Sequence, residues 1–350
     1  RGGMNTLRLL AQDGLQVPAG TAWYLADIGE ARGKQELFKR QMPQKLKVLL
    51  EHALIESAVS SNRIEGVKID PKRAWTLVLG AARYRDRNEE EVRGYRDALK
   101  LVHERAQELP LDEATVLTLH RLARGEIWDA GKYKERDANI IERSADGSER
   151  VRFTPVSAAE TPKAMAGLVA AWRDAQESVR VYPLLAAAAF NFDFLCIHPF
   201  RDGNGRISRL LLLLMCHQLG YEVGRYISLE RVIEQNKERY YETLERSSLG
   251  WHDGRHDPWP YINYLLYVLK SAYQEFEERV GEVKSPRGAK TEVVLDAIRR
   301  LGPTFALAEL EKACPGVSRD MVRRVLRSEQ RAGTLASEGR GPGARWRKKG

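Results

Sequence analysis

Apolar residues recur at helical spacing along most of this chain. The predicted helix over residues 46–62 carries on one face the apolar side chains Leu46, Leu49, Leu50, Ala53 and Leu54. Similar patterns predict further helices over residues 71–82, 89–108, 114–128, 155–177, 182–197, 207–219, 228–248, 257–278, 290–301, 307–313 and 319–331. Residues 4–45 hold Pro18 and several glycines, and we expect loop with short helices there. The pattern therefore predicts an all-α fold.

Two stretches depart from the helical pattern. Residues 139–141 and 151–154 flank a polar turn centred on Asp146-Gly147, which is typical of a β-hairpin. Residues 334–347 surround a glycine-rich tip and predict two short strands. Because three predicted helices precede that tip, residues 285–350 resemble a winged helix-turn-helix domain. Residues 280–288, with Pro286 and Gly288, are the predicted linker.

Composition bounds the class and the compartment. The chain has 350 residues, of which 43% are hydrophobic and 30% charged, as in an ordinary globular protein. Its longest apolar runs are far too short for a membrane span, so we expect no membrane partner. Residues 1–3 resemble a cloning remnant. Cys196, Cys216 and Cys314 form neither a disulfide framework nor a metal-binding pattern, which predicts a reducing cytoplasm.

The positive charge is concentrated at one end of the chain. Residues 285–350 carry 15 Lys and Arg against 7 Asp and Glu, so they hold +8 of the total net charge of +9. Arg319, Arg323 and Arg327 fall on one face of the last predicted helix. This asymmetry predicts DNA binding by residues 285–350. A protein-interaction or dimerisation module with a solvated basic face remains the alternative.

A polar loop, residues 198–209, lies between two apolar helices and has the features of a phosphate site. Gly203 and Gly205 allow a tight turn that points backbone N–H groups at one spot, at the positive end of the second helix. Arg206 and Arg209 add two cations in the first turn of that helix.

The same loop offers a base and a metal ligand. His198 has an unperturbed pKa near neutrality, which suits a general base. Asp202 supplies a hard oxygen ligand of the kind that Mg²⁺ takes beside substrate phosphates. A calcium-binding EF-hand starting at Asp202 is excluded, because Ile207 and Leu213 stand where glycine and glutamate are needed.

The string 198–209 resembles the signature of the Fic family, H-x-F-x-[DE]-G-N-G-R-x-x-R. The fixed positions are His198, Phe200, Asp202, Gly203, Asn204, Gly205, Arg206 and Arg209. The resemblance implies an all-α core with a β-hairpin flap that transfers AMP from ATP to hydroxyl groups of a target protein, including the enzyme itself. It also implies that His198 is the base, that Asp202 holds magnesium, and that residues 203–206 and Arg209 hold the phosphates.

Two further segments resemble parts of this family. Ser61-Asn-Arg-Ile-Glu65-Gly66 is similar to its inhibitory motif, [ST]-x-x-x-E-[GN], which implies that Glu65 pairs with Arg209 and restrains the enzyme. Ser61 shares a helix face with Glu65. Asn236, in a segment with paired tyrosines, is the candidate residue on the adenine side of the pocket; an ordinary amphipathic helix is the alternative.

The expected organisation has three parts. They are an N-terminal helical region over residues 4–112 with an inhibitory helix over about 46–66, a catalytic core over 113–279, and the winged helix-like domain over 285–350. The leading function is autoinhibited protein adenylylation. The alternatives are a nucleotide-sensing transcriptional regulator and a Fic enzyme that transfers another phosphate-linked group or removes AMP. The target protein and the oligomeric state, a homodimer included, stay open.

Overall fold

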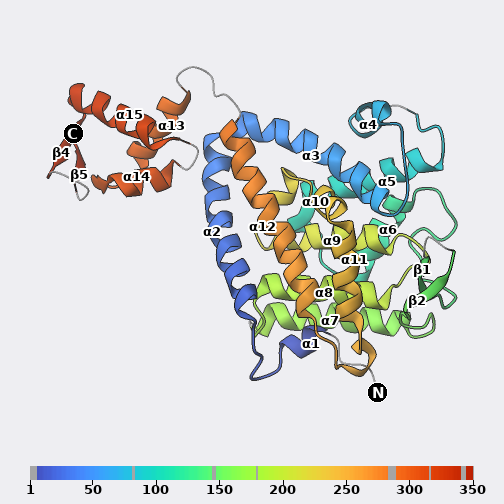
Figure 1. Cartoon of the computed structure of the whole chain (residues 1–350). Helices are drawn as coiled ribbons and strands as arrows, with labels where there is room; N and C mark the ends of the chain where they lie inside the picture. Colours follow the sequence, from blue (N-terminus) through green and yellow to red (C-terminus); the bar gives the residue numbers. More distant parts are fainter. Residues whose placement is uncertain are drawn as a thin grey trace. The chain divides into compact units, whose positions relative to one another are not determined.

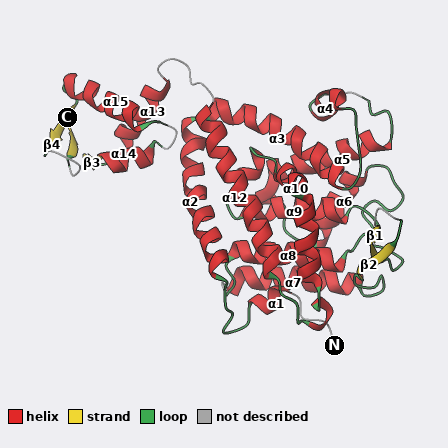
Figure 2. Cartoon of the chain, viewed as in Figure 1, coloured by secondary structure: helices red, strands yellow, loops and turns green. Residues whose placement is uncertain are grey.

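The fold is all-α with two small antiparallel sheets, as predicted (Figures 1 and 2). The computed structural model describes residues 6–80, 83–143, 147–178, 180–282, 289–314, 317–339 and 344–349. The main helices are α1 (Thr6–Leu10), α2 (Ala19–Gln41), α3 (Pro43–Ile64), α4 (Pro71–Val78), α5 (Arg87–Arg105), α6 (Glu113–Arg124), α7 (Thr161–Ser178), α8 (Pro183–Ile197), α9 (Asn204–Gln218), α10 (Leu229–Gln235), α11 (Lys237–Ser248) and α12 (Trp259–Glu282). No helix among these described residues is long and apolar enough to cross a membrane.

The expectation of loop with short helices over residues 4–45 was wrong, because α2 is a helix of 23 residues. Its buried face carries Thr21, Ile28 and Gln35, seven residues apart, and two of these three are polar. Hydrogen bonds from α12 satisfy both: Thr21 Oγ1 donates to Asn263 Oδ1 at 2.6 Å, and the Tyr273 hydroxyl donates to Gln35 Oε1 at 2.9 Å. A hydrophobic pattern cannot detect a helix that docks through polar side chains.

The chain divides into two compact units. The first comprises residues 1–28 and 49–272, and the second comprises residues 29–48 and 273–350. The first unit contains the polar loop and the hairpin. The predicted linker falls partly on the end of α12, which reaches Glu282, and residues 283–288 lie outside the described part of the chain.

The core of the first unit is built around α8 and α9. Every residue of α8 after Pro183 is buried, including Asp193, and α9 is buried over nearly its whole length. The two helices pack against each other, α7 packs on α8, and α5 and α6 pack on α9 (Figure 1). The Asp193 carboxylate accepts hydrogen bonds from the Thr6 backbone and hydroxyl and from Trp251, which attaches α1 to α8. The loop between α8 and α9 is therefore anchored at both ends by buried helices.

The predicted hairpin is confirmed. It consists of β1 (Ile140–Arg143) and β2 (Glu149–Phe153), which pair antiparallel with Ile141 opposite Val151. Asp146 lies outside the described residues, and Gly147 has φ +83°, a conformation that favours glycine. The β2 strand lies against α11.

The basic end of the chain contains, among its described residues, three helices and three short strands, where the sequence predicts three helices and two strands. These elements are α13 (Ala289–Arg300), β3 (Thr304–Ala306), α14 (Leu307–Ala313), α15 (Arg319–Arg331), β4 (Leu335–Glu338) and β5 (Arg345–Lys348). The three strands form one antiparallel sheet in the order β3-β5-β4. Phe305, Leu310 and Leu326 are in the buried cluster that joins the helices to this sheet.

Candidate active site

His198 directly follows α8 and has a left-handed backbone conformation. Its φ is +51° and its ψ is +61°, and no other described residue except glycine has a positive φ. Its N–H donates to the Phe194 carbonyl at 2.9 Å, which closes the last turn of the helix. Burial, reinforced by the nearby Lys134 cation, lowers the pKa of His198 to about 4. The imidazole is therefore neutral at pH 7 and able to accept a proton.

The loop after His198 is held in shape by its own side chains. The Asn204 amide accepts from the Phe200 N–H at 2.8 Å and donates to the Phe200 carbonyl at 2.7 Å. Gly203 has φ +88°, and a Cβ there would lie 3.2 Å from Arg124 Cδ. Asn204 was predicted to bind nucleotide; the structure shows its buried side chain closing the loop that starts α9.

His120 of α6 packs against this loop and forms a hydrogen bond with it. Its ring stacks on Phe200 with 3.7 Å between ring centroids and 2° between planes. The Gly131 N–H donates to His120 Nδ1 at 2.9 Å, so Nε2 carries the proton and donates to the Asp202 carbonyl at 3.0 Å. Burial lowers the pKa of His120 to about 4, which keeps this arrangement neutral.

Asp202 is placed as a single carboxylate on a half-exposed side chain. One oxygen accepts from the Gly203 N–H at 2.6 Å, and the other pairs with Arg124 at 2.8 Å. Burial acts to raise its pKa, but Arg124 and Arg206 outweigh burial and hold the pKa below its usual value. The described residues contain no cluster of three metal-ligating side chains. The site therefore fits Mg²⁺ held by one carboxylate and substrate phosphates, rather than a cage of protein ligands.

Arg206 points into the protein. Its guanidinium is 1% exposed and pairs with Glu91 of α5 at 2.8 Å, and it also donates to Asn62 Oδ1 at 3.2 Å. Glu91 in turn pairs with Arg124 at 3.0 Å. Arg206 was predicted to contact phosphate, whereas in this structure it joins the start of α9 to α3, α5 and α6.

Arg209, one turn later, makes the contact that the inhibitory motif implied. Its Nη2 lies 2.8 Å from Glu65 Oε1, its Nε donates to Ser61 Oγ at 2.9 Å, and Nη2 also donates to the Ser61 carbonyl at 3.0 Å. Glu65 lies directly against the loop, because a Cβ on Gly205 would overlap its Oε1. A carboxylate thus occupies the start of α9, where phosphate is expected to bind.

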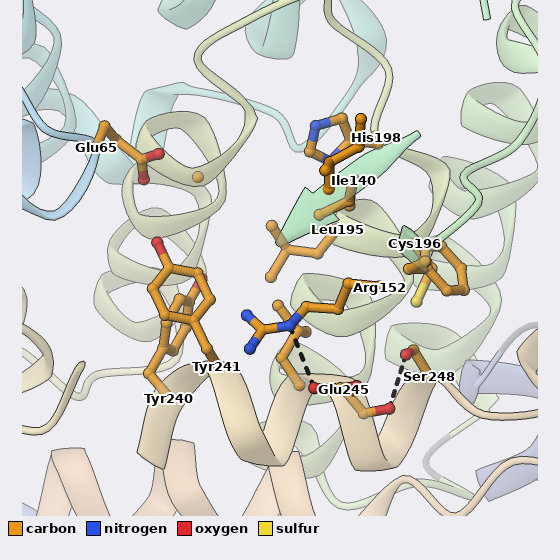
Figure 3. A pocket seen from close by; sticks show the side chains of 14 residues that line it. Glu65, Ile140, Arg152, Leu195, Cys196, His198, Tyr240, Tyr241, Glu245 and Ser248 are labelled. Atoms are coloured by element: carbon orange, nitrogen blue, oxygen red, sulfur yellow. Dashed lines mark hydrogen bonds and ion pairs between the residues drawn. The ribbon is translucent and has the colours of Figure 1, made fainter. Parts of the chain in front are cut away.

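A cavity of about 330 Å³ opens beside these residues (Figure 3). Glu65 and His198 lie on opposite sides of it, and Arg152 of β2 reaches toward the space between them (Figure 3). The remaining lining residues are Ile140, Ile141, Phe153, Leu195, Cys196, Gly205, Tyr240, Tyr241, Leu244, Glu245 and Ser248. Strand residues and α11 therefore close two of its sides.

Asn236 is not among the residues that line this cavity. It separates α10 from α11 with non-helical φ −119° and ψ 33°, and its side chain donates to the Val232 carbonyl at 3.0 Å. Tyr240 and Tyr241 line the cavity instead. Arg152 lies 5.5 Å from the Tyr241 ring centroid and pairs with Glu245 at 3.2 Å.

Sequence reasoning did not single out Glu91, which lies within the helix predicted over residues 89–108. A signal was present, because Glu91 is spaced by helical turns from the buried residues Tyr95, Ala98 and Val102. A glutamate on the apolar stripe of a helix indicates a buried partner. Lys134 and Arg152 had no comparable signal.

The loop 198–209 lies within a segment that matches a known protein family. Residues 110–216 match the sequence model of the Fic/DOC family. A protein adenylyltransferase named fic-1 from Caenorhabditis briggsae is 26% identical over 219 residues, which cover 61% of this chain and 37% of that protein. This chain thus spans little more than a third of the length of that relative.

Two solved structures share the fold. One is a Fic family protein from Desulfovibrio desulfuricans G20, with a TM-score of 0.63 and 23% identity, covering 97% of this chain and 98% of that chain. The other is a Fic domain containing signaling protein from Bacteroides thetaiotaomicron VPI-5482, with a TM-score of 0.62 and 24% identity, covering 74% and 99%.

Proposed function

We propose that this chain, whose residues 110–216 match the Fic/DOC family model, is a protein adenylyltransferase restrained by its own Glu65. The observation that carries the proposal is the arrangement of three groups around one cavity. A neutral His198 lies on one side, the start of α9 offers a phosphate site, and Glu65 occupies that site while paired with Arg209. The adenylyltransferase name of the C. briggsae relative supports AMP as the transferred group.

In the proposed reaction, His198 takes the proton from a hydroxyl of the target protein. The hydroxyl oxygen then attacks the α-phosphorus of ATP, the bond to the bridging oxygen breaks, and pyrophosphate leaves. The N–H groups at the start of α9 hold the phosphates. Magnesium, held by Asp202, would neutralise phosphate charge. His120 and Asn204 keep the loop in the conformation that presents these groups.

The restraint follows from electrostatics at one point. Arg209 is buried, and its Nε and Nη2 donate to Ser61 and Glu65. A γ-phosphate arriving at the start of α9 would meet the Glu65 carboxylate and lose the Arg209 cation. We therefore propose that ATP binds wild-type protein in a poorly aligned pose, and that removing the carboxylate restores a productive one.

The reaction class is tested with ATP labelled on either the α- or the γ-phosphate. We expect protein-bound label from the α-position only, and none after His198→Ala, since loss of a general base typically costs about 10²–10⁴-fold. Label from the γ-position would mean phosphorylation, and parallel incubation with UTP would reveal another nucleotide. Release of label from modified protein would identify AMP removal.

We also propose that the winged helix binds duplex DNA, which would suit the regulator alternative. The supporting observation is that Arg319, Arg323 and Arg327 are exposed on α15, the third helix of this part of the chain. Arg319 is paired with Glu311 at 2.9 Å, which leaves Arg323 and Arg327 as the stronger candidates.

Fluorescence anisotropy of the full chain with a labelled duplex tests this second proposal. Binding should weaken steeply between about 50 and 200 mM salt, and Arg323→Ala with Arg327→Ala should reduce the salt slope by roughly 2. Arg299→Ala on α13 is the matched control. Absence of binding at low salt would favour a protein-interaction module.

A further inference from the structure

Lys134 contacts three successive carbonyl groups at the end of α8. Its Nζ donates to the Ile197 carbonyl at 3.1 Å and to the His198 carbonyl at 2.9 Å, and its backbone N–H donates to the Pro199 carbonyl at 2.9 Å. The side chain is 6% exposed. One residue from the segment between α6 and β1 therefore holds the chain before, at and after His198.

The Ile197 and His198 carbonyls lie at the C-terminus of α8, where the helix supplies no hydrogen-bond donor for them. The last carbonyls of a helix have no intrahelical donor and carry the negative end of its dipole, which a cation satisfies. His198 also has a left-handed conformation, which a residue other than glycine keeps only where its surroundings enforce it. The three hydrogen bonds from Lys134 tie down the backbone at His198 and on both sides of it.

The charge of Lys134 acts on the same residue. Burial lowers the pKa of Lys134 to about 8, against the opposing effect of Asp137, so the group is still mostly a cation at pH 7. Its cation lowers the pKa of His198, whereas Glu65 and Asp202 act in the opposite sense. Asp129, Glu135, Arg136 and Arg201 line the neighbouring cavity, and the side-chain hydrogen bonds of Lys134 go to the Ile197 and His198 carbonyls.

We propose that Lys134 is a positioning residue for the proposed catalytic base, holding the backbone of His198 so that its ring faces the cavity. This inference rests on the role proposed for His198. A residue that only stabilised the fold would leave the chemistry of that imidazole unchanged, whereas Lys134 sets both its orientation and its electrostatic environment.

The test compares four variants in the Glu65→Gly background. Lys134→Met removes the hydrogen bonds and the charge, Lys134→Gln keeps a neutral donor, and Lys134→Arg keeps a cation. Lys132→Met, an exposed lysine two residues away, is the matched control. For each variant, AMP transfer is measured against pH, thermal unfolding is recorded, and the His198 pKa is followed by NMR of labelled histidine.

We expect Lys134→Met to lower kcat by about 10²-fold, the cost of a misplaced catalytic group, with little change in the KM for ATP. The His198 pKa should rise from its lowered value, although burial still holds it below its ordinary range, and the acid limb of the rate profile should move upward with it. Lys134→Gln should raise that pKa with a smaller loss of kcat, and Lys134→Arg should keep it low.

The proposal is overturned if Lys134→Met matches Lys132→Met in both kcat and His198 titration. If Lys134→Met fails to fold, wild-type behaviour of Lys134→Gln in both measurements overturns it equally. Should no variant transfer AMP, the proposed function fails, while the NMR titration still tests whether Lys134 controls His198.

Discussion

Arg206 and Arg209 lie one turn apart on α9, and each forms an ion pair with a glutamate. The two pairs have the same nitrogen–oxygen distance but differ in the burial and the location of the glutamate. Both Arg206–Glu91 and Arg209–Glu65 have a nitrogen–oxygen distance of 2.8 Å. In the first pair the glutamate belongs to the interior of α5 and its side chain is 10% exposed. In the second it follows the end of α3, lines the cavity and is 28% exposed.

The difference indicates which pair can open. Glu91 also pairs with the buried Arg124 and the partly exposed Arg87, so its release would disrupt these ion pairs together with the one to Arg206. Glu65 has Arg209 as its ion-pair partner, and Arg209 would keep its two contacts with Ser61. We therefore expect the first pair to be a permanent support for the loop and the second to be a contact at the cavity for which nucleotide competes.

Loss of Glu91 should have the largest effect on stability. Glu91→Ala removes the carboxylate 2.8 Å from the buried Arg206, which is left with Asp202 at 3.7 Å. Arg124 keeps Asp202 at 2.8 Å. Breaking a buried pair typically costs about 3–5 kcal/mol. The free energy of unfolding in urea measures this, with Glu104→Ala, an exposed residue of the same helix, as control. Equal stability of the two variants would show that the Glu91 cluster is not a support.

Asn62 should have an intermediate effect, because it lies next to both pairs. Asn62→Ala removes the acceptor for Arg206 and a hydrogen bond of 2.8 Å to the Ala58 carbonyl, both fully buried. We expect a loss of about 1–3 kcal/mol in the same urea measurement. If Asn62→Ala lowered the free energy of unfolding more than Glu91→Ala does, Glu91 would not be the main support of this cluster.

Glu65 should contribute least to stability. Glu65→Gln keeps an acceptor for Arg209 and removes the charge of a partly exposed pair, for which we expect less than about 1 kcal/mol. The thermal midpoint should hardly move. A strongly destabilised Glu65→Gln protein would mean that this pair is a structural support like the first.

The sequence allowed much of this to be predicted where chemistry is local. The loop 198–209 and the hairpin depend on residues whose spacing or type is visible in the sequence. The Glu65–Arg209 pair joins residues 144 positions apart, and only the resemblance of residues 61–66 to an inhibitory motif implied it. The burial of Arg206 against Glu91 could not be predicted, because the two residues are 115 positions apart and lie on different helices. Helix α2 was not predicted for a related reason, since two of its buried residues are polar and form hydrogen bonds with α12.

The central claim is that Glu65 restrains transfer, and auto-modification with α-labelled ATP tests it most directly. Glu65→Gly should increase the rate at least about tenfold over wild type, equivalent to ~1.4 kcal/mol of barrier, and adding His198→Ala should abolish the gain. A Glu65→Gly protein that is folded, binds ATP and labels itself no faster than wild type would contradict the account.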